Sequence, residues 1–167
     1  MMYDKKSYWL SKCIGKKLRC RREKVTVAES CTGGWIAKVL TDIHGSSKWF
    51  ERGFIAYSNE AKQQMLGVQA ATLAYYGSVS KQTVSEMVLG ACKAASAEYG
   101  IAVSGIAGPN GGTLTKPVGT VWFAITGPDR QIFTYLNMFS GTRSTIRGQS
   151  VIRALQVLHD QFLKNFS

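Results

Sequence analysis

The stretch that decides the fold is VTVAESCTGG, residues 25–34. It begins with Val25, Thr26 and Val27, which are typical of a strand, and ends with two glycines after a run of small polar side chains. A strand that turns directly into a helix leaves backbone N–H groups open at the helix N-terminus. The stretch therefore predicts a strand–turn–helix unit. Its turn either faces a phosphate or an oxyanion or only caps the helix.

The rest of the chain continues this alternation of strands and helices. Further strands are predicted over 48–58, 101–108, 119–126 and 131–139, and helices over 32–43, 59–66, 80–100 and 143–162. In the helix over 80–100 the apolar residues recur at helical spacing, and Gly100 is expected to end it. Because no linker or internal repeat interrupts the pattern, we expect one α/β domain with a mixed sheet flanked by helices.

Composition narrows the class of protein. The 167 residues are 45% apolar, which suits one domain, and no apolar run is long enough to span a membrane. Residues 1–24 lack the features of a signal peptide, and Cys13, Cys20, Cys31 and Cys92 form no C-x-x-C pair. We therefore expect a cytoplasmic protein with reduced thiols, without a membrane partner and without a structural zinc site.

The net charge of +11 is concentrated at the start of the chain. Residues 1–24 hold nine lysines and arginines against two acidic residues, and their apolar positions predict a basic amphipathic helix that belongs to the same domain as residues 25–167. A solvated helix face is the favoured interpretation. Binding of this segment to nucleic acid is the alternative, but it is not expected, because no nucleic-acid-binding motif accompanies the charge.

Small hydroxyl residues and glycines gather at four predicted element ends: 30–34, 45–47, 104–108 and 140–142. Strand-to-helix junctions of α/β proteins commonly converge on one crevice, and free N–H groups there favour anions. Together the four clusters favour a ligand that carries a phosphate or a carboxamide. Each cluster taken alone is equally well explained as an N-cap or a turn.

Four longer motifs carry a resemblance to a known family. They are VTVAESCTGGWIAKVLTDIHGSSKWFERGFIAYSNEAKQQMLGV, GSVSKQTVSEM, VSGIAGPNGGTLTKPVGTVWFAI and FSGTR, within residues 25–147. The chain resembles the stand-alone form of the CinA C-terminal-domain family, whose characterised members are nicotinamide-nucleotide amidases. The resemblance implies hydrolysis of the carboxamide of nicotinamide mononucleotide (NMN) to nicotinate mononucleotide and ammonia. It also implies a homo-oligomer and no metal or other cofactor.

The resemblance also points to particular residues. Ser30, Ser47, Tyr57, Lys62 and Arg143 are present with the motif spacing intact. Arginine in the motif FSGTR suits a fork that binds the phosphate or a carboxylate. The AESCTGG turn is expected to form one wall of the substrate pocket, and three further residues are expected to contact the ligand: Thr32, Gly33 and Gly105.

The chemistry of amide hydrolysis is compatible with these residues. The reaction needs a nucleophile, a base, an acid for the leaving nitrogen and donors for the oxyanion. No histidine is well placed, so a serine activated by Lys62 is the natural solution, provided that burial or a nearby cation lowers the pKa of this lysine. Ser47 is the predicted nucleophile, Ser30 is the second candidate, and Tyr57 relays a proton or orients the lysine. Cys31 is a third candidate, although a buried packing role is favoured for it.

Two other classes of function stay open at this point. One is an inactive paralogue that binds the nucleotide without turning it over. The other is a basic accessory protein that holds nucleic acid through residues 1–24.

Overall fold

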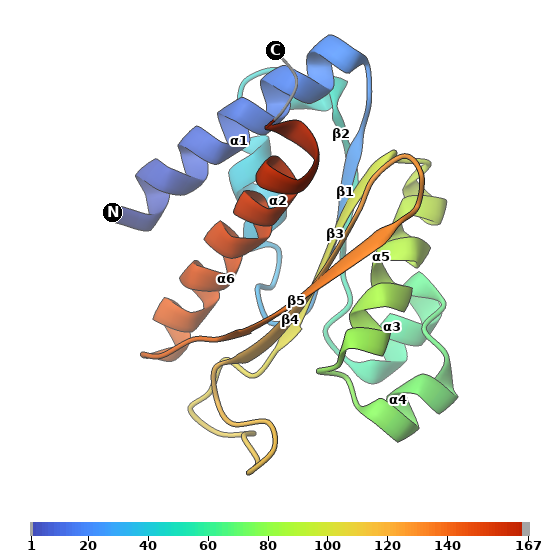
Figure 1. Ribbon diagram of the computed structural model, residues 1–167, viewed down its shortest axis with the longest axis vertical. Coiled ribbons are helices and arrows are strands. Elements are labelled where there is room, and N and C mark those ends of the chain that lie inside the picture. Colours follow the sequence, from blue (N-terminus) through green and yellow to red (C-terminus); the bar gives the residue numbers. More distant parts are fainter. Residues whose placement is uncertain (1, 165–167) are drawn as a thin grey trace.

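A computed structural model describes residues 2–164, in which a five-stranded sheet lies between two layers of helices (Figure 1). The strands are β1 (Val25–Glu29), β2 (Phe50–Ile55), β3 (Tyr99–Gly105), β4 (Thr120–Thr126) and β5 (Ile132–Met138). The helices are α1 (Met2–Arg21), α2 (Trp35–Thr41), α3 (Asn59–Leu66), α4 (Ala70–Tyr76), α5 (Lys81–Ala95) and α6 (Arg143–Leu158). A 3₁₀ turn at Ser46–Lys48 precedes β2, and a π-helical turn at His159–Leu163 follows α6.

The strand order is β2-β1-β3-β4-β5, with β2, β1 and β3 parallel and with β4 and β5 antiparallel to their neighbours. The prediction of an α/β fold with a mixed sheet is confirmed. Every residue of β1 is buried, because helices cover both faces of the parallel part of the sheet.

Each face of the sheet has its own core. On one face α1, α2 and α6 pack over the odd-numbered residues of β1 and β3, and on the other α3, α4 and α5 pack over Ala28 and Ala102 (Figure 1). Helix α1 joins the first core through Leu10, Ile14 and Leu18, at the four-residue spacing of one helix face. Most of its basic side chains are exposed on the outer face, whereas Arg21 is half-buried and donates to the hydroxyl of Tyr99.

The topology gathers the carboxyl ends of the parallel strands at one edge of the sheet. Chain segments 30–34, 56–58 and 106–108 leave β1, β2 and β3 there, and α6 begins beside them, toward the lower end of Figure 1. In open α/β sheets this edge is where ligands bind.

The structure differs from the predicted elements in four places. The helix expected over 32–43 begins at Trp35, because residues 30–34 form a turn, and the strand expected over 48–58 is confined to β2. Helix α4 was not predicted. The helix expected over 80–100 ends at Ala95, and Gly100 lies within β3.

The position of Gly100 in β3 has a packing reason. A Cβ atom there would lie 2.5 Å from Sγ of Cys92 and 2.9 Å from Cγ2 of Val88, so only glycine allows α5 to approach the strand this closely. The helix ends instead at Ala95, and its C-cap residue Ser96 has a φ of 49°, in the left-handed region.

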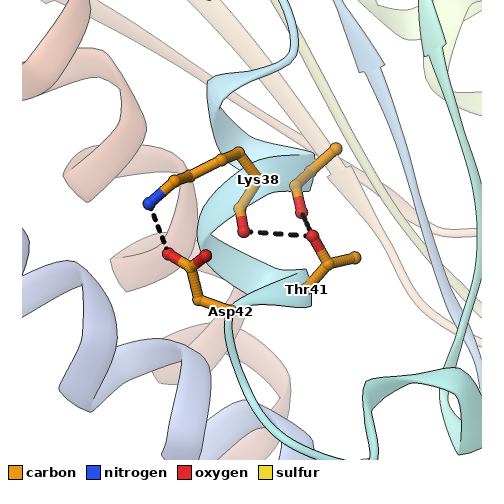
Figure 2. A network of polar contacts seen from close by, with 4 residues as sticks. Lys38, Thr41 and Asp42 are labelled. Atoms are coloured by element: carbon orange, nitrogen blue, oxygen red, sulfur yellow. Dashed lines mark hydrogen bonds and ion pairs between the residues drawn. The ribbon is translucent and has the colours of Figure 1, made fainter.

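The end of α2 away from the site is held by polar contacts on its exposed side. Figure 2 shows Nζ of Lys38 2.6 Å from Oδ2 of Asp42, one turn further along, while the Thr41 hydroxyl donates to the carbonyl of Lys38. An exposed pair of this spacing contributes about 0.3–0.5 kcal/mol. It stabilises the C-terminal end of a two-turn helix whose N-terminal end forms part of the site.

Candidate active site

The centre of the site is a buried contact between Lys62 and Ser30. Lys62 lies on α3, whose N-cap Ser58 accepts a hydrogen bond from the N–H of Ala61. The lysine side chain is only 1% exposed, and its Nζ lies 3.1 Å from Oγ of Ser30. It donates to the carbonyls of Ala56 and Tyr57, each at 3.0 Å. Within residues 2–164 this ammonium has no carboxylate partner.

Burial lowers the pKa of the Lys62 ammonium from its ordinary value of 10.5, and the neighbouring Cys31 opposes this change only in part. A neutral amine keeps two N–H groups, which the carbonyls of Ala56 and Tyr57 accept. Its lone pair then faces the remaining neighbour, the hydroxyl of Ser30. This geometry suits proton transfer from the serine to the lysine.

Ser30 is the first residue after β1, and the adjacent strand fixes its backbone. Its N–H donates to the carbonyl of Val103 at 3.1 Å, and its side chain is 8% exposed. Its Oγ lies 3.5 Å from the carbonyl of Tyr57, the same oxygen that accepts from Lys62. The hydroxyl is thus held next to the amine with a small part of its surface open to a ligand.

The turn after Ser30 is held from the inside by Glu29. This carboxylate is buried and accepts from the N–H groups of Gly34, Ile36 and Ala37 at 2.8–3.1 Å. It therefore satisfies open donors at the start of α2 and places a negative charge at the positive end of the helix. A carboxylate with three N–H partners is stable when buried, although Glu29 has no ion pair among the residues that the structure describes.

The Glu29→Gln variant tests this role in stability. Glutamine keeps the shape but presents an NH₂ group toward backbone donors, so at least one buried N–H loses its acceptor. We expect the free energy of unfolding to fall by about 1–3 kcal/mol. Urea titrations of parent and variant measure the difference. A midpoint equal to that of the parent contradicts the role given to this carboxylate.

Tyr57 and Arg143 lie at the mouth of the site. Tyr57 is 57% exposed, and its hydroxyl accepts a hydrogen bond from Nη2 of Arg143 at 3.0 Å. Nη1 of Arg143, the first residue of α6, donates to the carbonyl of Gly108 at 2.8 Å. The Tyr57 side chain therefore orients Arg143 rather than Lys62, while its backbone carbonyl holds the lysine.

The three residues expected to bind substrate have different positions. Gly33 is exposed in the turn with a φ of 60°, and Gly105 is half-buried at the end of β3. Thr32 is 0% exposed, and its hydroxyl has no hydrogen-bond partner among the described residues. The Thr32 side chain is thus not open at the surface of the turn, and its contact with substrate stays a prediction.

Ser47 is not brought to Lys62. It is exposed in the 3₁₀ turn before β2. Two residues later, the backbone carbonyl of Trp49 accepts a hydrogen bond from the N–H of Val25. This contact places Ser47 at the amino end of β1, whereas Ser30 follows the carboxyl end of the same strand. The expectation that Lys62 activates Ser47 is therefore corrected, and Ser30 is the serine in contact with the lysine.

Cys31 is 5% exposed, and burial raises the pKa of its thiol to about 12. A thiol that stays protonated at neutral pH is a poor nucleophile. The favoured interpretation of Cys31 as a packing residue agrees with this environment.

Arg147 also contacts the turn, although no sequence motif pointed to it. Its Nε donates to the carbonyl of Cys31 and its Nη2 to the carbonyl of Thr32, each at 3.0 Å. The only signal in the sequence is its position one helical turn after Arg143, on the same face of α6.

The described part of the chain contains no helix that is long and apolar enough to cross a membrane. Within the same residues no three His, Cys, Asp or Glu side chains lie together as metal ligands would. The groups that gather at the carboxyl edge are a lysine, hydroxyls, two arginines, a carboxylate and backbone amides and carbonyls.

The fold and the site together define an α/β protein of the CinA C-terminal-domain class. The sequence-family model of the CinA C-terminal domain matches residues 8–162, and the chain belongs to this family. Among its relatives, the nicotinamide-nucleotide amidohydrolase PncC of Escherichia coli (strain K12) is 55% identical over 164 residues, which are 98% of this chain and 99% of that protein. The protein of the same name from Pseudomonas putida is 47% identical over 145 residues, 87% of this chain and 90% of that protein.

A solved structure agrees with the fold. The competence/damage inducible protein CihA from Agrobacterium tumefaciens superposes with a TM-score of 0.91 at 40% identity, covering 93% of this chain and 94% of that one. The resemblance to the family drawn from the sequence motifs is confirmed.

Proposed function

We propose that this protein hydrolyses the carboxamide of NMN, with Ser30 as the nucleophile and Lys62 as the base. The observation that carries the proposal is the contact between Oγ of Ser30 and the buried Nζ of Lys62. A relative named nicotinamide-nucleotide amidohydrolase, 55% identical over nearly the whole chain, supports NMN as the substrate.

The reaction proceeds in two steps through an ester. Neutral Lys62 takes the proton of the Ser30 hydroxyl, and Oγ attacks the carboxamide carbon. The C–N bond breaks, Lys62 returns the proton to the leaving nitrogen, and ammonia departs. Water, deprotonated by the same amine, then attacks the ester carbon, and the C–O bond to Ser30 breaks while Lys62 returns the proton to Oγ of Ser30. The products are nicotinate mononucleotide and the regenerated serine.

The mouth of the site suits the rest of the substrate. The phosphate of NMN is bound by Arg143, whose guanidinium has five N–H donors, of which two are used by Gly108 and Tyr57. The exposed ring of Tyr57 presents an aromatic face to the cationic pyridinium ring, an attraction of about 0.5–1 kcal/mol at an exposed position.

The Arg143→Met variant tests the phosphate contact. Loss of charge-assisted hydrogen bonds worth about 1.5–3 kcal/mol lowers kcat/KM for NMN by about 10–100-fold. Nicotinamide riboside, which lacks the phosphate, is the matched control substrate, and its kcat/KM should fall much less. An equal loss for both substrates contradicts a phosphate role for Arg143.

The proposed function itself is tested by incubating the purified protein with NMN and measuring ammonia and nicotinate mononucleotide. We expect equal amounts of the two products. If NMN binds but neither product forms, the chain is the nucleotide-binding paralogue and the proposal fails.

A further inference from the structure

Arg147 connects α6 to the turn that carries Ser30. Its planar guanidinium spans two consecutive carbonyls, with Nε donating to Cys31 and Nη2 donating to Thr32. The same group lies over the ring of Trp35 at 5.6 Å from the centroid. An arginine suits this place because its donors form a rigid fork, whereas lysine offers a single point charge.

The turn has few backbone hydrogen bonds of its own. Gly33 and Gly34 have φ angles of 60° and 94°, which take the chain out of regular structure. Only two backbone contacts cross it, from the N–H of Gly33 to Ser30 and from the N–H of Trp35 to Thr32. Its shape therefore depends on hydrogen bonds to side chains.

Two charged side chains, one buried and one half-buried, supply that support. Glu29 accepts from the donors at the start of α2, and Arg147 donates to the carbonyls just after Ser30. A Cβ atom at Gly33 would lie only 3.3 Å from Nη2 of Arg147, so the guanidinium closes against the backbone of the turn itself.

We propose that Arg147 is a positioning residue of the active site, one that fixes the direction of the Ser30 hydroxyl and of the turn's N–H groups through the Cys31 and Thr32 carbonyls. The inference rests on the proposed amidase function for its kinetic consequence. Its structural consequence, a turn that is more open without Arg147, does not depend on that function. Since Nε and Nη2 of Arg147 donate to the carbonyls of Cys31 and Thr32, the residue acts through the turn that carries Ser30.

The test compares the parent with Arg147→Met and Arg147→Lys. Because a misplacement of about 1 Å costs on the order of 100-fold in rate, we expect kcat for NMN hydrolysis to fall by about 100-fold in Arg147→Met while KM changes little. Arg147→Lys keeps the charge but bridges one carbonyl at a time, so its kcat should lie between those of the parent and Arg147→Met.

Arg153→Met is the matched control. Arg153 lies on the same helix, makes a hydrogen bond to Asn137 and lies over the ring of Tyr135 at 5.3 Å, but it does not touch the turn. Its substitution removes the same kind of side chain and should leave kcat unchanged.

Hydrogen exchange gives a readout that needs no activity. In Arg147→Met the backbone amides of residues 30–37 should exchange about tenfold faster than in the parent, with no such change in Arg153→Met. A kcat of Arg147→Met within threefold of the parent overturns the proposal, as does unchanged exchange in this segment. If the parent does not hydrolyse NMN, the proposed function fails, and the exchange measurement alone decides whether Arg147 holds the turn. If Arg147→Met does not fold, Arg147→Lys carries the same comparison.

Discussion

Ser30→Ala should lose NMN hydrolysis by on the order of 10³-fold or more in kcat, while Ser47→Ala keeps a rate within about threefold of the parent. The reason is the position of each serine relative to the base. Oγ of Ser30 lies 3.1 Å from Nζ of Lys62, whereas Ser47 is exposed at the amino end of β1. Ammonia release at saturating NMN measures both variants under the same conditions.

The two serine variants control for each other, because each removes only one hydroxyl from a short segment. Ser30 lies just after β1, and Ser47 lies just before β2. Thermal unfolding should show both variants folded. A large loss in Ser47→Ala, with Ser30→Ala active, would return the nucleophile to Ser47 and contradict the site described above.

Lys62→Met should lose about 10³-fold in kcat, within the range of about 10²–10⁴-fold that a general base contributes. The parent needs the neutral amine, so its kcat should rise as the pH rises through the lowered pKa of Lys62. The residual rate of Lys62→Met should lack that rise. Lys62→Arg keeps a cation that does not deprotonate, and it should be as inactive as Lys62→Met. A pH profile of kcat that is the same in the parent and Lys62→Met contradicts the role of Lys62 as the base.

The same pKa has a consequence for stability. Because the pKa of Lys62 is lower in the folded protein than the ordinary value of 10.5, the unfolded chain binds more protons between these two values. The free energy of unfolding of the parent, relative to Lys62→Met, should therefore rise with pH in this window and be constant below it. Urea titrations of both proteins at several pH values measure this difference. A relative stability that falls with rising pH contradicts a lowered pKa.

Much of the fold follows from local sequence. The β-branched start of β1, the apolar spacing within α5 and the glycine-rich turns predict the order of most elements and a mixed sheet. The short helix α4 has no such pattern, since Leu73 is its only buried residue. The end of α5 was also missed, because Gly100 is required by close packing in β3 and not by a helix C-cap.

The candidate site was harder to predict because it depends on strand register. Glycine and hydroxyl clusters flank Ser30 and Ser47 alike, so the sequence offers no local reason to prefer one. The parallel pairing of Glu29 with Ile55 determines which serine lies near Lys62, because it places the chain after β1 beside the chain after β2. Lys62, one turn into the following helix, then reaches Ser30.

Arg147 could not be inferred for a related reason. Its partners are the carbonyls of Cys31 and Thr32, more than a hundred residues earlier in the chain, and a carbonyl has no signature in a sequence. The ligand contact predicted for Thr32 rested on a hydroxyl within a glycine-rich motif. The sequence did not indicate that this side chain is buried.

The central claim is that Ser30 attacks the carboxamide and becomes an ester. The most direct measurement mixes the protein with NMN, stops the reaction in acid within the first turnover, and determines by peptide mass spectrometry which residue carries the acyl group. The account predicts an adduct equal to NMN minus ammonia on Ser30, absent from Ser30→Ala. An adduct on Ser47 or Cys31, or full turnover by Ser30→Ala, would contradict it.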